Sequence, residues 1–227
     1  MISQQSSAQG LVFIYLEAGP DVNETDLNAW YDNEHAPLRL TVPGFMSAIR
    51  YKAVDSQNPK WLTLYDIETP EAANSDAYNA LRAQGSDNEK AILSKLGGLS
   101  RRSYLHMGTF THPDTKPEEL PSKYVFVVSL EMTPEGEDEL NKWYDEEHMD
   151  LLSKIPGWKA GRKRGELADQ PVAKYLAIHE LSNNDFLSTP EFKHATSTEW
   201  RARVMKNAVR REVRIFELHK DFGKSKV

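Results

Sequence analysis

The sequence predicts an α+β protein made of two copies of one β-α-β-β-α-β unit. Three observations support this prediction. The chain has 227 residues, the length of two small domains of about 100 residues each. A block of residues in the first predicted helix recurs later at a constant offset. In each half, apolar strand-like segments and amphipathic segments follow one another in the same order.

The repeat is clearest in one six-residue block. Residues 30–35 read Trp-Tyr-Asp-Asn-Glu-His, and residues 143–148, which lie 113 positions later, read Trp-Tyr-Asp-Glu-Glu-His. At the same offset, the Pro-Gly pair at 43–44 matches the Pro-Gly pair at 156–157. We infer a gene duplication that produced two homologous halves.

The predicted organisation follows from this repeat. The segment between the halves is rich in proline and charged residues, which is typical of an extended linker. We therefore predict a disordered tail at 1–10, a first repeat at 11–111, a linker at 112–123, a second repeat at 124–220 and a tail at 221–227.

Each element of the repeat is predicted from its own pattern. The first strands are continuous apolar runs, which indicates that both of their faces are covered. The first helices end before Pro-Gly, a common stop signal. The second and third strands are rich in aromatic and β-branched residues. The predicted ranges are strands 11–16, 45–54, 61–67 and 103–110 with a late helical segment at 70–96, and strands 124–130, 158–166, 174–181 and 213–219 with a late helical segment at 190–209.

This order is that of a ferredoxin-like unit, in which helices cover one face of a four-stranded antiparallel sheet. The other face also carries apolar side chains and must be covered. Two sheets that face each other would cover both. A duplicated chain can thereby do within one molecule what a homodimer does with two.

The repeated block also contains the residues that could carry chemistry. At 100° per residue, the first helix has an inward stripe that includes Leu27 and Leu38, with Ala36 on the opposite side. The repeated tyrosine, glutamate and histidine lie on or beside this stripe, and the tryptophan lies near its edge. These residues are Trp30, Tyr31, Glu34 and His35 in the first half and Trp143, Tyr144, Glu147 and His148 in the second.

An acid and an imidazole beside an apolar stripe allow two interpretations. They could form a structural hydrogen-bond network that the duplication copied, because a buried charge is costly unless it is paired. They could instead line a pocket between helix and sheet, where imidazole is the usual general acid or base near neutral pH. The sequence leaves both interpretations open.

The Trp-Tyr-x-x-Glu-His block, followed by Pro-Gly-aromatic at the second strand, resembles the EthD-like branch of the dimeric α+β barrel superfamily, here as a tandem fusion. The resemblance implies an intramolecular dimeric α+β barrel. It places the helix histidine of the family at His35 and His148, and the glutamate at Glu34 and Glu147. It also implies decarboxylases, cyclases, lactone isomerases and monooxygenases as related activities, some cofactor-free and some haem-dependent.

The third strands add a difference between the halves. When the two strands are aligned, Tyr65 and His179 occupy equivalent positions. Each could be a core residue, or could join the helix histidine of its own half in a pocket, and the strand register decides between these alternatives. His106 on the last strand of the first half is a weaker pocket candidate.

Several function classes are excluded or disfavoured by composition. The chain contains no cysteine, so it has no thiolate ligand, disulfide or thiol nucleophile. The net charge of −6 disfavours binding to nucleic acid and to a membrane surface. No metal-ligand spacing or glycine-rich phosphate loop is present. The N-terminus lacks a secretory signal, from which we expect a cytoplasmic protein.

We therefore hypothesise an enzyme of secondary metabolism, a cofactor-independent lyase, isomerase or cyclase that acts on a small aromatic or polyketide-like substrate. His35, His148 and His179 would transfer protons, supported by Glu34 and Glu147. The expected substrate-binding residues are Tyr31, Tyr144, Tyr65, Trp30, Trp143 and His106, with no metal. The alternatives are a non-catalytic binding module for a hydrophobic metabolite and a haem-dependent monooxygenase. The tandem chain could also form a homodimer.

Overall fold

The computed structural model describes residues 8–166 and 173–224. By their internal contacts these residues form two units, each with its own core. The described part of the first unit comprises residues 8–106 and 218–224, and that of the second comprises residues 107–217 apart from 167–172. Two long strands contribute residues to both units. The repeat boundaries expected from sequence, 11–111 and 124–220, stay a prediction.

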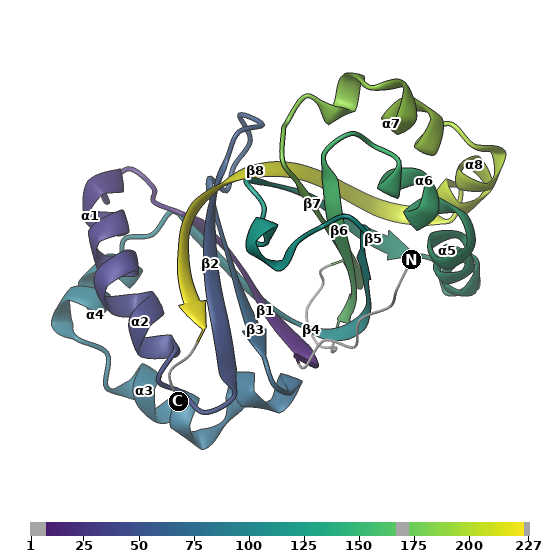
Figure 1. Ribbon diagram of the computed structural model, residues 1–227. Coiled ribbons are helices and arrows are strands. Elements are labelled where there is room, and N and C mark those ends of the chain that lie inside the picture. Colours follow the sequence, from purple (N-terminus) through teal and green to yellow (C-terminus); the bar gives the residue numbers. More distant parts are fainter. Residues whose placement is uncertain (1–7, 167–172, 225–227) are drawn as a thin grey trace. The chain divides into compact units, whose positions relative to one another are not determined.

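The first unit follows the predicted order of elements, and its helices lie together on one side of its strands (Figure 1). The elements are β1 (Gly10–Glu17), α1 (Glu24–Trp30), the π-helical turn η1 (Tyr31–His35), α2 (Ala36–Arg39), β2 (Phe45–Ala53), β3 (Trp61–Ile67), the 3-10 turn η2 (Pro70–Asn74), α3 (Asp76–Ala83), α4 (Asp87–Leu93) and β4 (Gly98–Thr111).

The strands of the first unit are antiparallel in the order β4-β1-β3-β2. Phe13, in the middle of β1, pairs with Leu64 of β3 and with Arg102 of β4. The residues of β1 are buried from Gly10 to Leu16, which confirms the prediction that both faces of this strand are covered. On the helix side of the sheet, Tyr65 packs in a cluster with apolar residues of β1 and β2.

The second unit repeats this arrangement with the strand order β8-β5-β7-β6. Its elements are the 3-10 turn η3 (Pro117–Glu119), β5 (Tyr124–Met132), the 3-10 turn η4 (Pro134–Gly136), α5 (Glu137–Trp143), the π-helical turn η5 (Tyr144–His148), α6 (Met149–Ser153), β6 (Trp158–Glu166), β7 (Tyr175–Leu181), the 3-10 turn η6 (Phe186–Ser188), α7 (Pro190–Ala195), α8 (Glu199–Met205) and β8 (Ala208–Lys224).

The late helical segments are interrupted where the sequence analysis treated each as one stretch. Ser75 and Ser86 each accept a hydrogen bond from a backbone N–H three residues later, so each begins a new helix within 70–96. Thr189 and Thr198 do the same for α7 and α8.

The ends of the chain are more ordered than expected. Gly10 already belongs to β1, and β8 continues to Lys224, so residues 221–224 are strand rather than the predicted tail. His219 and Lys220 both contact Asp32, which ties this end of β8 to the first helix of the first unit. Residues 1–7 and 225–227 of the predicted tails lie outside the described residues.

The repeated sequence block folds as a π-helical turn in both halves. The N–H of Ala36 donates to the carbonyl of Tyr31, five residues back, and the N–H of Met149 donates to the carbonyl of Tyr144. The extra residue in this turn rotates the side chains of all later residues about the helix axis. Ala36 is therefore fully buried and Leu38 is 38% exposed, so a stripe built on 100° per residue is wrong for both residues.

Within residues 8–166 and 173–224, every helix is too short or too polar to cross a lipid bilayer.

The altered register can be tested by two substitutions in the first half. Ala36→Leu should lower the free energy of unfolding by about 1–3 kcal/mol, because a larger side chain overfills a closed site. Leu38→Ala should lower it less, by under about 1 kcal/mol, because 38% of Leu38 is already exposed to solvent. Urea unfolding of both variants measures the difference, and the opposite ranking would restore the regular α-helical register.

Candidate functional site

Two tyrosines meet between the first helix and the sheet of the first unit. The hydroxyls of Tyr31 and Tyr65 lie 3.2 Å apart, and both side chains are fully buried. Burial raises the pKa of both phenols, that of Tyr65 well above its ordinary value, so both stay protonated. The sequence alignment placed Tyr65 at a possible pocket position, and the structure brings it onto the helix side beside Tyr31.

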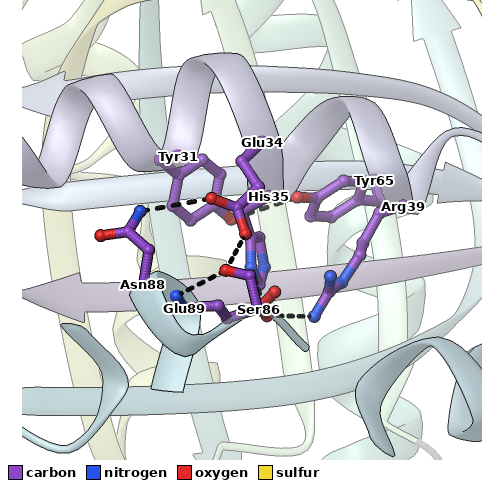
Figure 2. A network of polar contacts seen from close by, with 8 residues as sticks. All are labelled: Tyr31, Glu34, His35, Arg39, Tyr65, Ser86, Asn88 and Glu89. Atoms are coloured by element: carbon purple, nitrogen blue, oxygen red, sulfur yellow. Dashed lines mark hydrogen bonds and ion pairs between the residues drawn. The ribbon is translucent and has the colours of Figure 1, made fainter. Parts of the chain in front are cut away.

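His35 is bound by an acid that the sequence analysis did not single out (Figure 2). Its Nδ1 lies 3.1 Å from Oε1 of Glu89, and Arg39 donates to the same oxygen at 2.8 Å. Burial lowers the pKa of His35. The hydrogen bond with His35, together with the charge of Arg39, lowers the pKa of Glu89 to about 2 despite its burial. A neutral imidazole thus donates to a carboxylate whose charge Arg39 balances.

Glu34 bonds to two residues at the start of α4 (Figure 2). Its carboxylate accepts hydrogen bonds from Ser86 at 2.5 Å and from Asn88 at 3.2 Å. Since Ser86 is also the N-cap of α4, Glu34 fastens the first helix to the start of the last one. The acid that touches His35 is therefore Glu89, not Glu34.

Glu147 makes the corresponding contacts in the second half. Its Oε1 accepts from Trp143 Nε1 at 3.0 Å and from Thr198 Oγ1 at 2.6 Å. Thr198 is the N-cap of α8. In both units, therefore, a glutamate of the first helix accepts a hydrogen bond from the side chain that caps the last helix, a contact called the clamp below.

His148 differs from His35 because no carboxylate of the described residues bonds to its ring. The imidazole is 7% exposed and stacks on Trp143 with ring centroids 4.0 Å apart. One ring nitrogen has a hydrogen bond with the Ala195 backbone, and Nδ1 has no hydrogen-bond partner among the described residues. Burial lowers the pKa of His148 well below its ordinary value, and the nearby His179 adds to this.

His179 lies in the same part of the second unit. It is 2% exposed, and its Nδ1 accepts from Trp158 Nε1 at 3.4 Å. Burial lowers its pKa to about 4, so it is neutral at neutral pH. The structure thus places His148 and His179 close enough to interact electrostatically, as the alignment of the third strands suggested.

A cavity of about 30 Å³ adjoins His148 between the helices and the sheet. It can hold a few water molecules or one small functional group. Its walls are Phe126, Val128, Leu130, Trp143, Tyr144, His148, Leu152, Phe192, Thr196, Arg201, Met205 and Arg211. Arg201 and Arg211 were not among the expected site residues. Burial raises the pKa of Tyr144, which therefore remains a hydroxyl donor.

A larger surface hollow, of about 590 Å³, lies between α1 and α4 in the first unit. Trp30 and Glu34 contribute to its wall, but His35 does not. This hollow and the first-half imidazole are therefore separate features. His106 lines neither of these two cavities, and its backbone N–H donates to the Gln9 carbonyl.

In the described part of the chain, no group of three or more histidine, aspartate or glutamate side chains lies close enough together to hold a metal ion. The missed residue Glu89 did have a sequence signal. Ser86 followed by Glu89 is a capping box, which marks the start of a helix. Its pairing with His35 depends on how α4 packs, which no local pattern indicates.

Comparison with known proteins supports the fold and nothing finer. No protein-family model and no curated protein matches the sequence. Among solved structures, an anthrone oxidase-like protein aligns with a TM-score of 0.70 over 100% of this chain and 97% of its own length, at 13% identity. A variant chlorite dismutase from Candidatus Nitrospira defluvii aligns with a TM-score of 0.62, covering 96% of this chain and 93% of its own, at 10% identity.

A proposed monooxygenase from Fusobacterium nucleatum subsp. nucleatum has a TM-score of 0.58, covering 96% of this chain and 95% of its own, at 11% identity. At such identities the likeness shows a shared fold. Membership of the EthD-like branch stays a prediction.

The resemblance noted in the sequence also raises haem as a cofactor, and the two helix histidines do not fit it. The His35 ring lies 4.7 Å from both Trp30 and Tyr31, and its Nδ1 is bonded to Glu89. His148 stacks on Trp143 beside a cavity of about 30 Å³, whereas a cofactor site measures roughly 300 Å³ or more.

The Glu89 network predicts a pH-dependent stability. Glu89→Gln should lower the free energy of unfolding by about 2 kcal/mol at pH 7, because it removes a buried charge from its two donors. The native pKa is depressed, so the stabilisation is complete above about pH 4.5 and is lost as the pH falls toward 2. The difference between wild type and variant should therefore shrink below pH 4.5.

Urea unfolding at a series of pH values measures this difference. Asp87→Asn, an exposed change in the same helix, serves as the control and should alter the midpoint little. A gap between wild type and Glu89→Gln that stays constant with pH would contradict the assigned ionisation.

Proposed function

We propose that the cleft of the second unit catalyses proton transfer on a small aromatic or polyketide-like metabolite, with His148 as the general base and acid. The reaction class is that of a lyase, isomerase or cyclase of secondary metabolism, and no cofactor takes part. The observation that carries this proposal is the free Nδ1 of a buried, neutral imidazole at the edge of a cavity.

The surrounding groups have matching roles in this proposal. The Nδ1 lone pair of His148 accepts a proton from the carbon or oxygen of the substrate that enters the cavity, and returns it at a second position. The hydroxyl of Tyr144, which lines the same cavity, donates a hydrogen bond to the oxygen on which negative charge develops. Trp143 and Glu147 hold the imidazole ring and its helix in place.

The first unit supports a structural role more strongly than a catalytic one. His35 and Arg39 both bind the same carboxylate oxygen, and the two tyrosine hydroxyls bind each other. Every one of these groups has a partner, so proton transfer at His35 would first require this network to open. We therefore propose that the second unit is the more active of the two.

A second candidate function uses the same first step. The likeness to an anthrone oxidase-like protein favours a substrate with a methylene group between aromatic rings. Removal of one proton by His148 would leave a carbanion that reduces O₂, so that the methylene becomes a ketone and one water molecule is released. Consumption of O₂ would separate this reaction from a lyase or isomerase.

The proposal also includes finer statements about organisation. We propose that the two units are ferredoxin-like repeats that form an intramolecular dimeric α+β barrel, that the chain works in the cytoplasm, and that its partner is the small molecule itself rather than nucleic acid or membrane. A homodimer of the tandem chain would be compatible with this function.

The test compares the two helix histidines. His148→Gln should lower kcat/KM by about 10²–10⁴-fold on a panel of phenolic ketones and acids, because it removes the proton acceptor. His35→Gln, the matched change in the other half, should reduce stability and leave turnover within a few-fold of wild type. Mass spectrometry of products and an oxygen electrode measure both reaction types. Equal activity in wild type and a folded His148→Gln variant would refute the role of His148.

A further inference from the structure

The two halves carry opposite charges at the position that faces the helix imidazole. In the first half, Ser86 caps α4 and Glu89 lies three residues after it. In the second half, Thr198 caps α8 and Arg201 lies three residues after it. The two caps receive the same clamp from Glu34 and Glu147, so the two following positions are equivalent.

The first helices of the two halves also differ in charge at one buried position. Arg39, which balances Glu89 in the first half, corresponds at the repeat offset of 113 to Leu152 in the second. Both side chains are buried, at 4% and 2% exposed respectively. The second half thus has neither the buried carboxylate nor the buried cation that pairs with it, and it has a cation, Arg201, at the carboxylate position.

The two arginines of the second half lie closer to solvent than Glu89 does, since Arg201 is half-buried and Arg211 is exposed. Arg201 and Arg211 both line the His148 cavity, and no aspartate or glutamate does. In the described part of the chain no ion pair joins either guanidinium to a carboxylate. Burial, and after it the charge of Arg211, lower the pKa of Arg201. Arginine suits a carboxylate well, because one guanidinium can donate two parallel hydrogen bonds to it.

The other walls of the cavity are apolar or aromatic, including Phe126, Phe192 and Met205. The volume of about 30 Å³ suits one small functional group. His148 lines the cavity together with the arginines, and its buried Nδ1 has no hydrogen-bond partner in the described residues. Charge, size and lining together describe a subsite for an anionic group on an otherwise hydrophobic molecule.

We propose that this cavity binds the carboxylate of a hydrophobic carboxylic acid, held by Arg201 and Arg211 where the first half carries its own Glu89. This inference rests on the proposed function, to which it adds the substrate class. The arginines neutralise the carboxylate, and His148 remains available for proton transfer on the adjoining part of the molecule.

The experiment measures binding rather than turnover. Isothermal titration of the full chain with benzoate and with benzamide compares an anion with a neutral molecule of similar shape. We expect benzoate to bind at least tenfold more tightly. Arg201→Met, which keeps the apolar stem, should lower benzoate affinity at least tenfold and leave benzamide unchanged. Arg203→Met, an exposed change on the same helix, is the control and should change neither.

A second variant tests the equivalence of the halves. Arg201→Glu combined with Leu152→Arg rebuilds the first-half charge pair in the second half. This double variant should lose benzoate binding and should unfold at a higher urea concentration than Arg201→Glu alone. Equal affinity for benzoate and benzamide, or benzoate binding that survives Arg201→Met, would overturn the proposal.

The outcomes are separable from those for the proposed function. His148→Gln should retain benzoate binding, because the arginines remain, while it loses turnover. If benzoate binds as expected and His148→Gln stays active, the catalytic proposal fails and the anion site stands. If turnover depends on His148 but benzoate does not bind, the anion site fails and the catalytic proposal stands.

Discussion

The structure depends on one backbone hydrogen bond that occurs in both halves, from the residue after the histidine to the carbonyl of the tyrosine five positions earlier. A π-helical turn is less regular than an α-helix and occurs mostly as an isolated feature. Here it sets the tyrosine and histidine rings against each other, with centroids 4.7 Å apart in the first half and 5.2 Å in the second. It also turns Ala36 and Met149 into the core.

An imidazole that is buried loses its hydrogen bonds to water, and the two halves replace them with different contacts. In the first half the proton on Nδ1 is directed at Glu89, and Arg39 balances the resulting carboxylate. In the second half the ring has no internal acid, and aromatic stacking on Trp143 replaces the ionic contact. The first arrangement is closed and favours stability, whereas the second leaves one nitrogen unused beside a cavity.

What the halves share is the clamp between helices. Glu34 and Glu147 each bind the side chain that caps the last helix, so one carboxylate joins two elements that are far apart in sequence. Duplication preserved this contact while the charge three residues beyond the cap was reversed. A shared scaffold with a changed polar interior is the pattern expected when one copy keeps a structural network and the other becomes free to bind a ligand.

Sequence alone was sufficient for the order of elements, because each strand and helix has a local pattern of apolar residues and each turn has its own Pro-Gly or capping signal. It also identified the repeated Tyr, Glu and His, because duplication makes such residues stand out. The orientation of Leu38 and Ala36 could not be obtained in this way, since the apolar pattern does not indicate the extra residue in the turn after Tyr31, which shifts every later residue of the helix.

The partners of the site residues were decided by tertiary structure. Glu89 lies 54 positions from His35, and Arg201 reaches the His148 cavity from another helix; neither contact leaves a trace in local periodicity. Hydrophobic patterning specifies which face of an element is buried, but not which polar groups meet there. Those polar contacts depend on how the helices pack on the sheet. In the described part of this protein they determine that His35 is paired with Glu89, whereas Nδ1 of His148 has no partner.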